Sequence, residues 1–224
     1  MKIKSTDQKF KVFPLLRLKD FPGFSRKDLT NLETYYHEQL KGHQAPEKRV
    51  GWNTARSQEV RFEALASVGI LEGARLLDVG CGLGGFWAHL KSKKIKAGYT
   101  GIDLFPNVIA EAKRLHPEAS FEDRVLTARP FPPGTFDYAF LSGVFNVKVR
   151  DNWKYMRAVL KNVLKQTKKA AAFNVLNRES GLKETTRFMV GPKELVVFGR
   201  KLGVRKVHLL DGYHHMDMTL FLYK

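Results

Sequence analysis

Residues 76–85 combine an acidic side chain with a glycine-rich turn, a pattern that suits the binding of a cofactor. Their sequence is Leu-Leu-Asp-Val-Gly-Cys-Gly-Leu-Gly-Gly, so Asp78 precedes three glycines at alternate positions, Gly80, Gly82 and Gly84. An apolar run, a glycine turn and the helix-compatible stretch 86–94 predict a strand, a tight turn and a helix. Glycine tolerates positive φ and lets a ligand lie against the backbone, while the helix N-terminus presents unpaired N–H groups. We therefore expect a cofactor cradle at this turn.

Two classes of cofactor compete for this turn. Gly80, Gly82 and Gly85 match the G-x-G-x-x-G fingerprint of dinucleotide-binding proteins, and Asp103 follows at a distance that suits a ribose-binding acid. The other class is S-adenosylmethionine. A carboxylate at Asp78, two residues before the first glycine, suits a ligand with an ammonium group and would sit poorly beside a pyrophosphate. Asp78 therefore favours S-adenosylmethionine over NAD(P).

Residues 76–84 resemble motif I of the class I S-adenosylmethionine-dependent methyltransferases. Asp103 resembles the family's ribose-binding acid at the end of its second strand, and residues 136–141, Phe-Asp-Tyr-Ala-Phe-Leu, resemble its fourth strand. The resemblance covers residues 54–224. It implies a doubly wound α/β fold with a mostly parallel seven-stranded sheet, an antiparallel C-terminal strand and helices on both faces. It also implies S-adenosyl-L-methionine as cofactor and S-adenosyl-L-homocysteine as product.

The order of the predicted elements agrees with this fold. Strands are predicted at 75–79, 97–103, 119–124, 136–141 and 170–176, and helices at 84–94, 106–116, 151–166 and 192–203. Such alternation is typical of a parallel sheet with helices on both faces. Residues 205–210 and 216–223 are predicted to be two strands joined by a turn at Asp211 and Gly212. A dinucleotide dehydrogenase would more often have a helical crossover there.

The N-terminal part is predicted to be a separate cover on this domain. Residues 1–24 are expected to form an irregular arm, 25–41 and 54–68 helices, and 42–51 a loop. We therefore divide the chain into an arm and helical lid, 1–53, and a Rossmann-like methyltransferase domain, 54–224. Tyr35, Tyr36 and His37 either line the acceptor pocket or belong to a packed helix face.

Ligands of doubly wound sheets bind outside the carboxyl ends of the parallel strands. This rule selects the predicted cofactor contacts Asp78, Gly80, Cys81, Gly82, Gly84, Asp103, Leu104, Asp123, Arg124, Ser142 and Gly143. By family resemblance, Asp103 accepts hydrogen bonds from both ribose hydroxyls. The family usually places an acid after the third strand against the adenine, and Glu122, Asp123 and Arg124 all remain candidates for this place. Apolar walls for the adenine are expected from Leu104, Phe105 and Leu126.

Related enzymes often close a lid over the methionine end of the cofactor with residues just before the core. Trp52, Arg56 and Arg61 occupy that part of the sequence. An arginine there could pair with the cofactor carboxylate. The alternative is that both arginines are solvated charges of a helix.

The methyl acceptor is poorly specified by sequence motifs. The residues after the fourth strand, Ser-Gly-Val-Phe-Asn at 142–146, lack the Asn/Asp-Pro-Pro-Tyr/Phe motif of amino-directed DNA and glutamine methyltransferases. Cys81 in the cofactor turn cannot serve as a nucleophile for cytosine C5. Catalytic candidates are His214, His215, Tyr213 and Asn146; the histidines titrate near neutral pH and suit a general base, or are simply solvated. Although His214, His215 and Asp217 form a His-His-x-Asp cluster, we expect no metal there.

Composition bounds the class of protein. The 224 residues suit one domain with an extension, and no apolar run approaches the ~20 residues that span a bilayer. One cysteine excludes an internal disulfide, and without a secretory signal we expect a cytoplasmic protein.

The net charge of +17 indicates either an RNA partner or a lysine-rich solvated surface. The most consistent function is methyl transfer to a small or medium-sized O or N acceptor. A tRNA or rRNA methyltransferase is the alternative enzyme, and a non-catalytic cofactor-binding protein is the alternative of another class. No membrane partner is expected.

Overall fold

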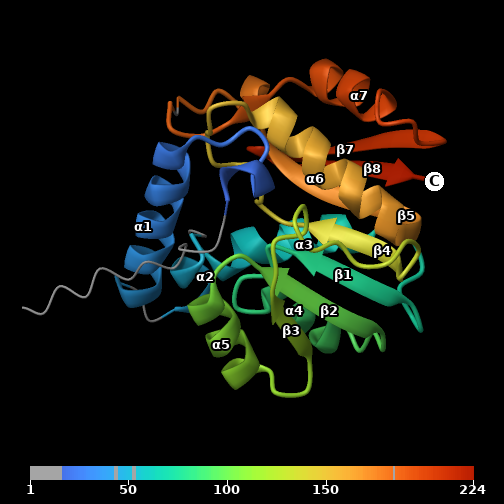
Figure 1. Ribbon diagram of the computed structural model, residues 1–224. Coiled ribbons are helices and arrows are strands. Elements are labelled where there is room, and N and C mark those ends of the chain that lie inside the picture. Colours follow the sequence, from blue (N-terminus) through green and yellow to red (C-terminus); the bar gives the residue numbers. More distant parts are fainter. Residues whose placement is uncertain (1–16, 43–44, 52–53, 184) are drawn as a thin grey trace, which may run out of the picture.

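The computed structural model describes residues 17–42, 45–51, 54–183 and 185–224 (Figure 1). The predicted arm lies largely outside these ranges, and so does Trp52. None of the helices in the described ranges has the length and hydropathy needed to cross a bilayer.

The centre of the molecule is one twisted sheet in the order β3-β2-β1-β4-β5-β8-β7 (Figure 1). Its parallel strands are β1 (Arg75–Val79), β2 (Gly98–Asp103), β3 (Ser120–Asp123), β4 (Phe136–Leu141) and β5 (Thr167–Asn177). β8 (Asp217–Tyr223) runs antiparallel to both β5 and β7 (Lys206–His214), so it alone on this path reverses direction. The short β6 (Met189–Val190) pairs with the end of β5. The predicted fold class, with its antiparallel C-terminal strand, is confirmed.

Helices cover both faces of the sheet. Successive side chains of a strand point to opposite faces, so the apolar central strands present apolar surface on each face. On one face α3 (Ala55–Ala66), α4 (Gly85–Ser92) and α5 (Pro106–Leu115) pack on the side that contains Leu76. On the other face α6 (Asn152–Gln166) and α7 (Pro192–Arg200) pack on the side that contains Leu77. The central strands are therefore apolar on both sides, as parallel strands buried by crossover helices must be.

The N-terminal helix α1 (Arg26–Gly42) lies at the end of the sheet where the parallel strands finish (Figure 1). Ser25 and Asp28 cap its start reciprocally: the Asp28 carboxylate accepts the Ser25 amide at 2.6 Å, and the Ser25 hydroxyl accepts the Asp28 amide at 3.2 Å. Asp28 also accepts the Arg150 amide at 3.0 Å, and the Gly23 carbonyl accepts the Asp151 amide at 2.8 Å. These bonds fix the start of α1 against the start of α6.

Local differences from the predicted elements have physical causes. The predicted loop 42–51 contains the one-turn helix α2 (Pro46–Arg49), which begins with a proline at a position where its missing N–H costs nothing. Asp211 and Gly212 lie inside β7 and not in a turn. The ladder between β7 and β8 shifts register between Leu210 and His214, and Gly212 has φ +74°. Asp211 and Gly212 therefore lie in a bulge of β7, and the chain reverses at residues 215–216.

Candidate active site

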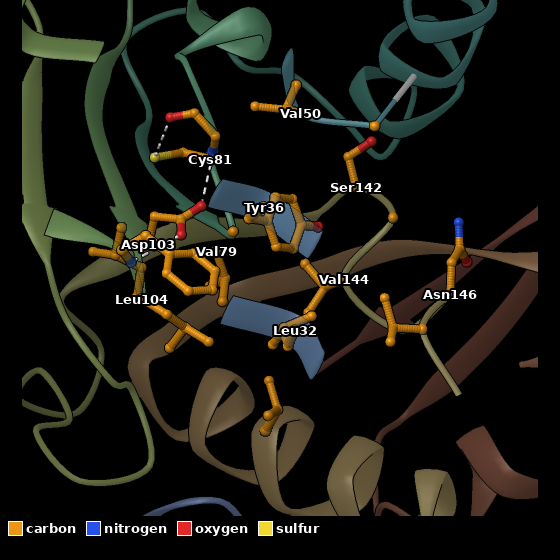
Figure 2. A pocket seen from close by; sticks show the side chains of 18 of the residues that line it. Leu32, Tyr36, Val50, Val79, Cys81, Asp103, Leu104, Ser142, Val144 and Asn146 are labelled. Atoms are coloured by element: carbon orange, nitrogen blue, oxygen red, sulfur yellow. Dashed lines mark hydrogen bonds between the residues drawn. The ribbon is translucent and has the colours of Figure 1, made fainter. Parts of the chain in front are cut away.

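A pocket lies at the carboxyl ends of the central strands, beneath α1. Most of the predicted cofactor contacts line it: Asp78, Gly80, Cys81, Gly82, Asp103, Leu104, Arg124, Ser142 and Gly143. Figure 2 shows Cys81, Asp103 and Leu104 on one side of the pocket and Ser142, Val144 and Asn146 on the other, with Leu32 and Tyr36 of α1 between them. The sheet topology thus brings the ends of β1, β2 and β4 to one place, as the rule for doubly wound sheets predicts.

Asp103 is held rigidly at the end of β2. Its carboxylate accepts the Gly82 amide at 3.0 Å and the Phe105 amide at 3.3 Å. Burial raises the pKa of Asp103, and the amides of Gly82, Phe105 and Leu104 oppose this rise. A carboxylate can accept about four hydrogen bonds, so oxygen lone pairs remain for a ligand in the pocket.

The amides of the glycine turn are already used within the protein. The amides of Gly80 and Cys81 both donate to the Ile102 carbonyl, at 2.8 and 3.0 Å, and that of Gly84 donates to the Cys81 carbonyl at 3.0 Å. The bonds to Ile102 and the bond from Gly82 to Asp103 attach the turn to β2. A pyrophosphate is bound by free backbone N–H groups. The turn therefore lacks the donors that a dinucleotide would need from these four residues.

Two glycines of the turn have φ of +72° and +54° and lie under apolar side chains. A Cβ on Gly80 would come within 2.7 Å of Val144 Cγ2, and one on Gly82 within 3.0 Å of Val50 Cγ1. The absence of a Cβ therefore lets Val144 and Val50, which both line the pocket, pack directly on the turn. Gly84 is outside the described lining; its Cβ would strike His116 and Phe121 at 2.7 and 2.8 Å, so it serves the packing of α4.

Asp78 is 2% exposed and accepts a hydrogen bond of 2.7 Å from the hydroxyl of Tyr99. Burial raises its pKa to about 7, and the bond from Tyr99 opposes this shift. Asp78 therefore passes from its neutral to its charged form near neutral pH. A cationic group placed beside it would favour the charged form.

At the end of β3 the pocket receives Arg124 and Leu126, and not the acidic side chains. Arg124 donates to Glu122 Oε2 from Nε at 3.0 Å and from Nη2 at 2.8 Å. Asp123 is exposed and lies outside the described lining. Of the three candidates for the place opposite the adenine, only Arg124 lines the pocket.

The loop after β4 is positioned by a buried asparagine of β5. Asn174 accepts the Gly143 amide at 2.7 Å through Oδ1, and its Nδ2 donates to Ser142 Oγ at 3.4 Å. Asn174 is fully buried, so it orients this loop and does not face a substrate.

Of the catalytic candidates, the structure brings only Asn146 into the pocket. Tyr213, His214 and His215 belong to β7 and the turn that follows it. They are separated from β4 by β5 and β8 in the sheet order and lie outside the described lining. The Tyr213 hydroxyl bonds to Thr219 Oγ1 at 2.9 Å, and His214 Nδ1 lies 3.1 Å from Asp217 Oδ2. Among the residues that the structure describes, no group of His, Cys, Asp and Glu forms a metal-binding arrangement.

The two arginines predicted near the cofactor carboxylate are elsewhere. Arg56 is exposed and pairs with Glu59 at 3.0 Å, as a solvated helix charge does. Arg61 is buried and pairs with Asp217, so neither prediction describes it. α3 contributes Gln58 and Phe62 to the pocket.

Sequence reasoning missed Arg187, which lines the pocket beside Tyr35 of α1. Its Nη2 lies 3.5 Å from the Tyr35 hydroxyl, and its guanidinium carbon lies 5.7 Å from the centre of the Tyr35 ring. The position is created by tertiary pairing of Arg187 with Val147, and no local motif of the sequence signals it. Tyr35 and Tyr36 of α1 do line the pocket.

Comparisons with known proteins agree with this geometry. Residues 76–167 match the model of a methyltransferase domain family. A methyltransferase-like protein of Mycobacterium tuberculosis is 26% identical over 153 residues, 66% of this chain and 91% of that protein. The trans-aconitate 2-methyltransferase of Methylobacterium nodulans is 36% identical over 72 residues, 32% of this chain and 28% of that protein.

Solved structures with the same fold include two methyltransferases. Human N-acetylserotonin methyltransferase, in complex with S-adenosylmethionine, has a TM-score of 0.67 and 15% identity, covering 89% of this chain and 59% of that one. The magnesium protoporphyrin IX methyltransferase of Synechocystis PCC 6803 has a TM-score of 0.62 and 13% identity, covering 89% and 98%. Residues 76–167 thus contain a methyltransferase domain, and the motifs at 76–84 and Asp103 together with the sheet order support a class I S-adenosylmethionine-dependent methyltransferase.

Proposed function

We propose that this protein methylates a small or medium-sized molecule on oxygen or nitrogen, with the cofactor bound by Asp103 and the glycine turn. The observation that carries the proposal is the Asp103 carboxylate, fixed by the Gly82 and Phe105 amides and still facing the pocket. Two ribose hydroxyls are the donors that such an acceptor suits. Glycine at positions 80 and 82 lets Val144 and Val50 pack closely on the turn, and these two side chains also line the pocket.

We assign the other lining residues to separate parts of the cofactor. Leu104, Phe105 and Leu126 offer apolar surface for the adenine, and Arg124 lies beside them. Asp78 offers a carboxylate to the ammonium group, whose charge would lower the pKa of Asp78 below its value of about 7. Ser142 and Gly143 follow on the far side of the turn.

When bound, S-adenosylmethionine supplies an electrophilic methyl group on a sulfonium. The protein's part is to align the acceptor and exclude water. The aromatic and aliphatic side chains of α1 and of the segment near Phe21 cover the pocket and serve the second purpose. Asn146 is placed to orient the acceptor.

The names of three similar proteins refer to small acceptors, namely protoporphyrin, aconitate and N-acetylserotonin. They support a small molecule over RNA as the substrate of this chain. The buried thiol of Cys81 is compatible with the reducing cytoplasm, which we propose as the location.

Calorimetry on the full chain tests the proposal. We expect S-adenosylhomocysteine to bind and NADH not to bind. Asp103→Ala should weaken S-adenosylhomocysteine binding by about 1.5–3 kcal/mol, the range for hydrogen bonds to a charged group. Asp123→Ala, which removes an exposed carboxylate one strand away, is the matched control and should bind as the parent does.

Because Asp103 also holds the Gly82 amide, Asp103→Asn is the second variant, which keeps one acceptor oxygen with no charge. It should fold like the parent and bind with intermediate affinity. Tighter binding of NADH than of S-adenosylhomocysteine would overturn the proposed cofactor, and unchanged binding by both Asp103 variants would overturn the role of Asp103.

A further inference from the structure

The end of the pocket beyond the cofactor turn is built from two segments that are far apart in the chain. The Phe188 amide donates to the Asn146 carbonyl at 2.9 Å, and the Lys148 amide donates to the Thr186 carbonyl at 3.3 Å. Between these bonds Val147 and Arg187 form an antiparallel bridge. This short ladder, residues 146–148 with 186–188, carries both Asn146 and Arg187 to the pocket wall.

Arg187 brings a positive charge into a partly apolar wall. Its side chain is half-buried and stacks beside Tyr35, whose hydroxyl lies 3.5 Å from Nη2. None of the ion pairs among the described residues includes Arg187. A guanidinium that is withdrawn from water gains from an anionic partner, and its planar fork matches a carboxylate.

Asn146 is a second and independent sign of a ligand at this place. It is 8% exposed, and its Oδ1 is buried without a hydrogen-bond partner among the described residues. Leaving a buried acceptor unpaired costs about 1–3 kcal/mol, and a ligand group that donates a hydrogen bond would remove this cost. Figure 2 shows the Asn146 side chain on the same side of the pocket as Ser142 and Val144.

Apolar side chains line much of the same pocket. Phe24, Leu32, Val149 and Tyr155 are among them, and the rings of Phe24 and Tyr155 meet edge to face at 4.8 Å. Such a surface suits a hydrocarbon or aromatic body. A single guanidinium balances one negative charge, which fits a carboxylate better than a phosphate dianion.

We propose that the methyl acceptor is a small organic acid with an apolar body, that Arg187 binds its carboxylate, and that Asn146 Oδ1 accepts a hydrogen bond from a hydroxyl or amino group of the same molecule. This inference rests on the proposed function, because it assigns the second ligand of the same pocket. Arg187 is a specificity-determining residue in this account.

The carboxylate of the cofactor itself is the competing partner for Arg187. The attachment of Arg187 to the wall after β4, where Asn146 also lies, favours the acceptor. Val144, two residues before the ladder, packs over Gly80 of the cofactor turn, so the two places adjoin. The effect of Arg187 variants on cofactor binding therefore distinguishes the two partners.

Binding to the full chain saturated with S-adenosylhomocysteine separates these accounts. The probes are benzoate, 3-phenylpropionate, cinnamate and octanoate, each compared with its primary amide by calorimetry or ligand-observed NMR. At least one acid should bind ten times more tightly than its amide. Arg187→Gln should remove this preference, and Arg187→Lys should restore part of it because the charge returns without the bidentate geometry.

Lys148→Gln is the matched control, since it removes an exposed positive charge from the same ladder. It should keep the preference for acids. S-adenosylhomocysteine affinity should change less than twofold in all three variants. For a transfer assay, a metabolite extract is first separated on an anion exchanger. After reaction with labelled S-adenosylmethionine, the methyl label should appear in compounds of the fraction that the exchanger retained.

Absence of any preference for acids across the four pairs would overturn the inference. So would a loss of S-adenosylhomocysteine binding in Arg187→Gln, which would assign Arg187 to the cofactor, or label found only in compounds that the exchanger does not retain. Failure of the parent protein to bind S-adenosylhomocysteine would instead overturn the proposed function, at a step that precedes every test of Arg187.

Discussion

The guanidinium of Arg61 in α3 pairs with the carboxylate of Asp217 at the start of β8, and their side chains are 3% and 0% exposed. The same guanidinium bonds to the carbonyl and hydroxyl of Ser57, one turn earlier in α3. α3 contributes Gln58 and Phe62 to the pocket. The pair therefore joins one wall of the pocket to the C-terminal hairpin.

Arg61→Met should destabilise the protein by about 3–5 kcal/mol, because it leaves the buried Asp217 carboxylate without its guanidinium partner and, among its ion pairs in the described structure, with only the contact to His214 at 3.1 Å. Urea denaturation measures this loss. Arg56→Met, on the exposed side of the same helix, should change the free energy of unfolding by less than about 0.5 kcal/mol. The double variant Arg61→Met, Asp217→Leu should recover much of the loss. Equal effects of Arg61→Met and Arg56→Met would show that the buried pair is unimportant.

Asp78 should make the protein less stable as the pH rises from about 4 to 7. Its folded-state pKa of about 7 exceeds the ordinary value of 3.8, so the folded protein keeps a proton that the unfolded chain releases. Stability from this group is complete below pH 4 and is lost as the pH passes through 7. Asp78→Asn should therefore gain stability relative to the parent over this range, by more than about 1 kcal/mol. Parallel denaturation curves at pH 4.5 and 7.5 that show no such gain would contradict this prediction.

Gly80→Ala should cost more stability than Gly73→Ala. Both positions have positive φ, +72° and +70°, so both substitutions carry a backbone cost of about 1–2 kcal/mol. The new Cβ at position 80 meets Val144 Cγ2 at 2.7 Å, whereas at Gly73 the described structure places no atom within 4 Å apart from the chain neighbours. Gly80→Ala should also weaken S-adenosylhomocysteine binding, and Val144→Ala should relieve part of its defect. Indistinguishable behaviour of the two alanine variants, in thermal unfolding and calorimetry, would show that the contact with Val144 does not matter.

RNA should bind only weakly and should not be methylated. The outer face of α6 carries Lys154, Arg157, Lys161 and Lys165, all exposed, and this helix contains no acidic residue. Such a stripe accounts for non-specific binding, with Kd of about 10⁻⁴–10⁻⁶ M near physiological salt. Filter binding at 50 and 200 mM salt should show this range and a steep loss with salt, reduced when all four residues become Gln. Transfer of labelled methyl groups to RNA would contradict the prediction and establish the alternative substrate.

The parallel strands could be predicted because their information is local. β1 and β4 have the predicted bounds, since each is a short apolar run delimited by turn residues or a change of pattern. Asp103 and the glycine turn were predictable for the same reason: the residue types and the strand end that positions them lie together in the sequence. By contrast, the signal at Asp211 and Gly212 was ambiguous, because a bulge and a turn use the same residues.

Long-range pairs escaped prediction. Tyr35 and Arg187 are 152 residues apart, and Arg61 and Asp217 are 156 apart. Each pair depends on where α1 or the C-terminal hairpin meets the rest of the fold. The hydrophobic periodicity of the sequence does not encode these meeting points. Arg187 therefore came only from the structure, whereas Asp103, the glycine turn and Asn146 followed from sequence.

The way α1 is fastened to the rest of the molecule determines how short a working version of the chain can be. Phe21, Leu29 and Leu32 share an apolar cluster with Phe105, Val108, Val125 and Val149. Arg49 adds an ion pair of 2.6 Å to Glu111 of α5. A chain shortened to begin at residue 54 would leave this cluster open to water and would aggregate instead of closing around a ligand. The segment matched by the family model, 76–167, lacks the α1 side of this cluster, so we expect expression trials to need the N-terminal residues.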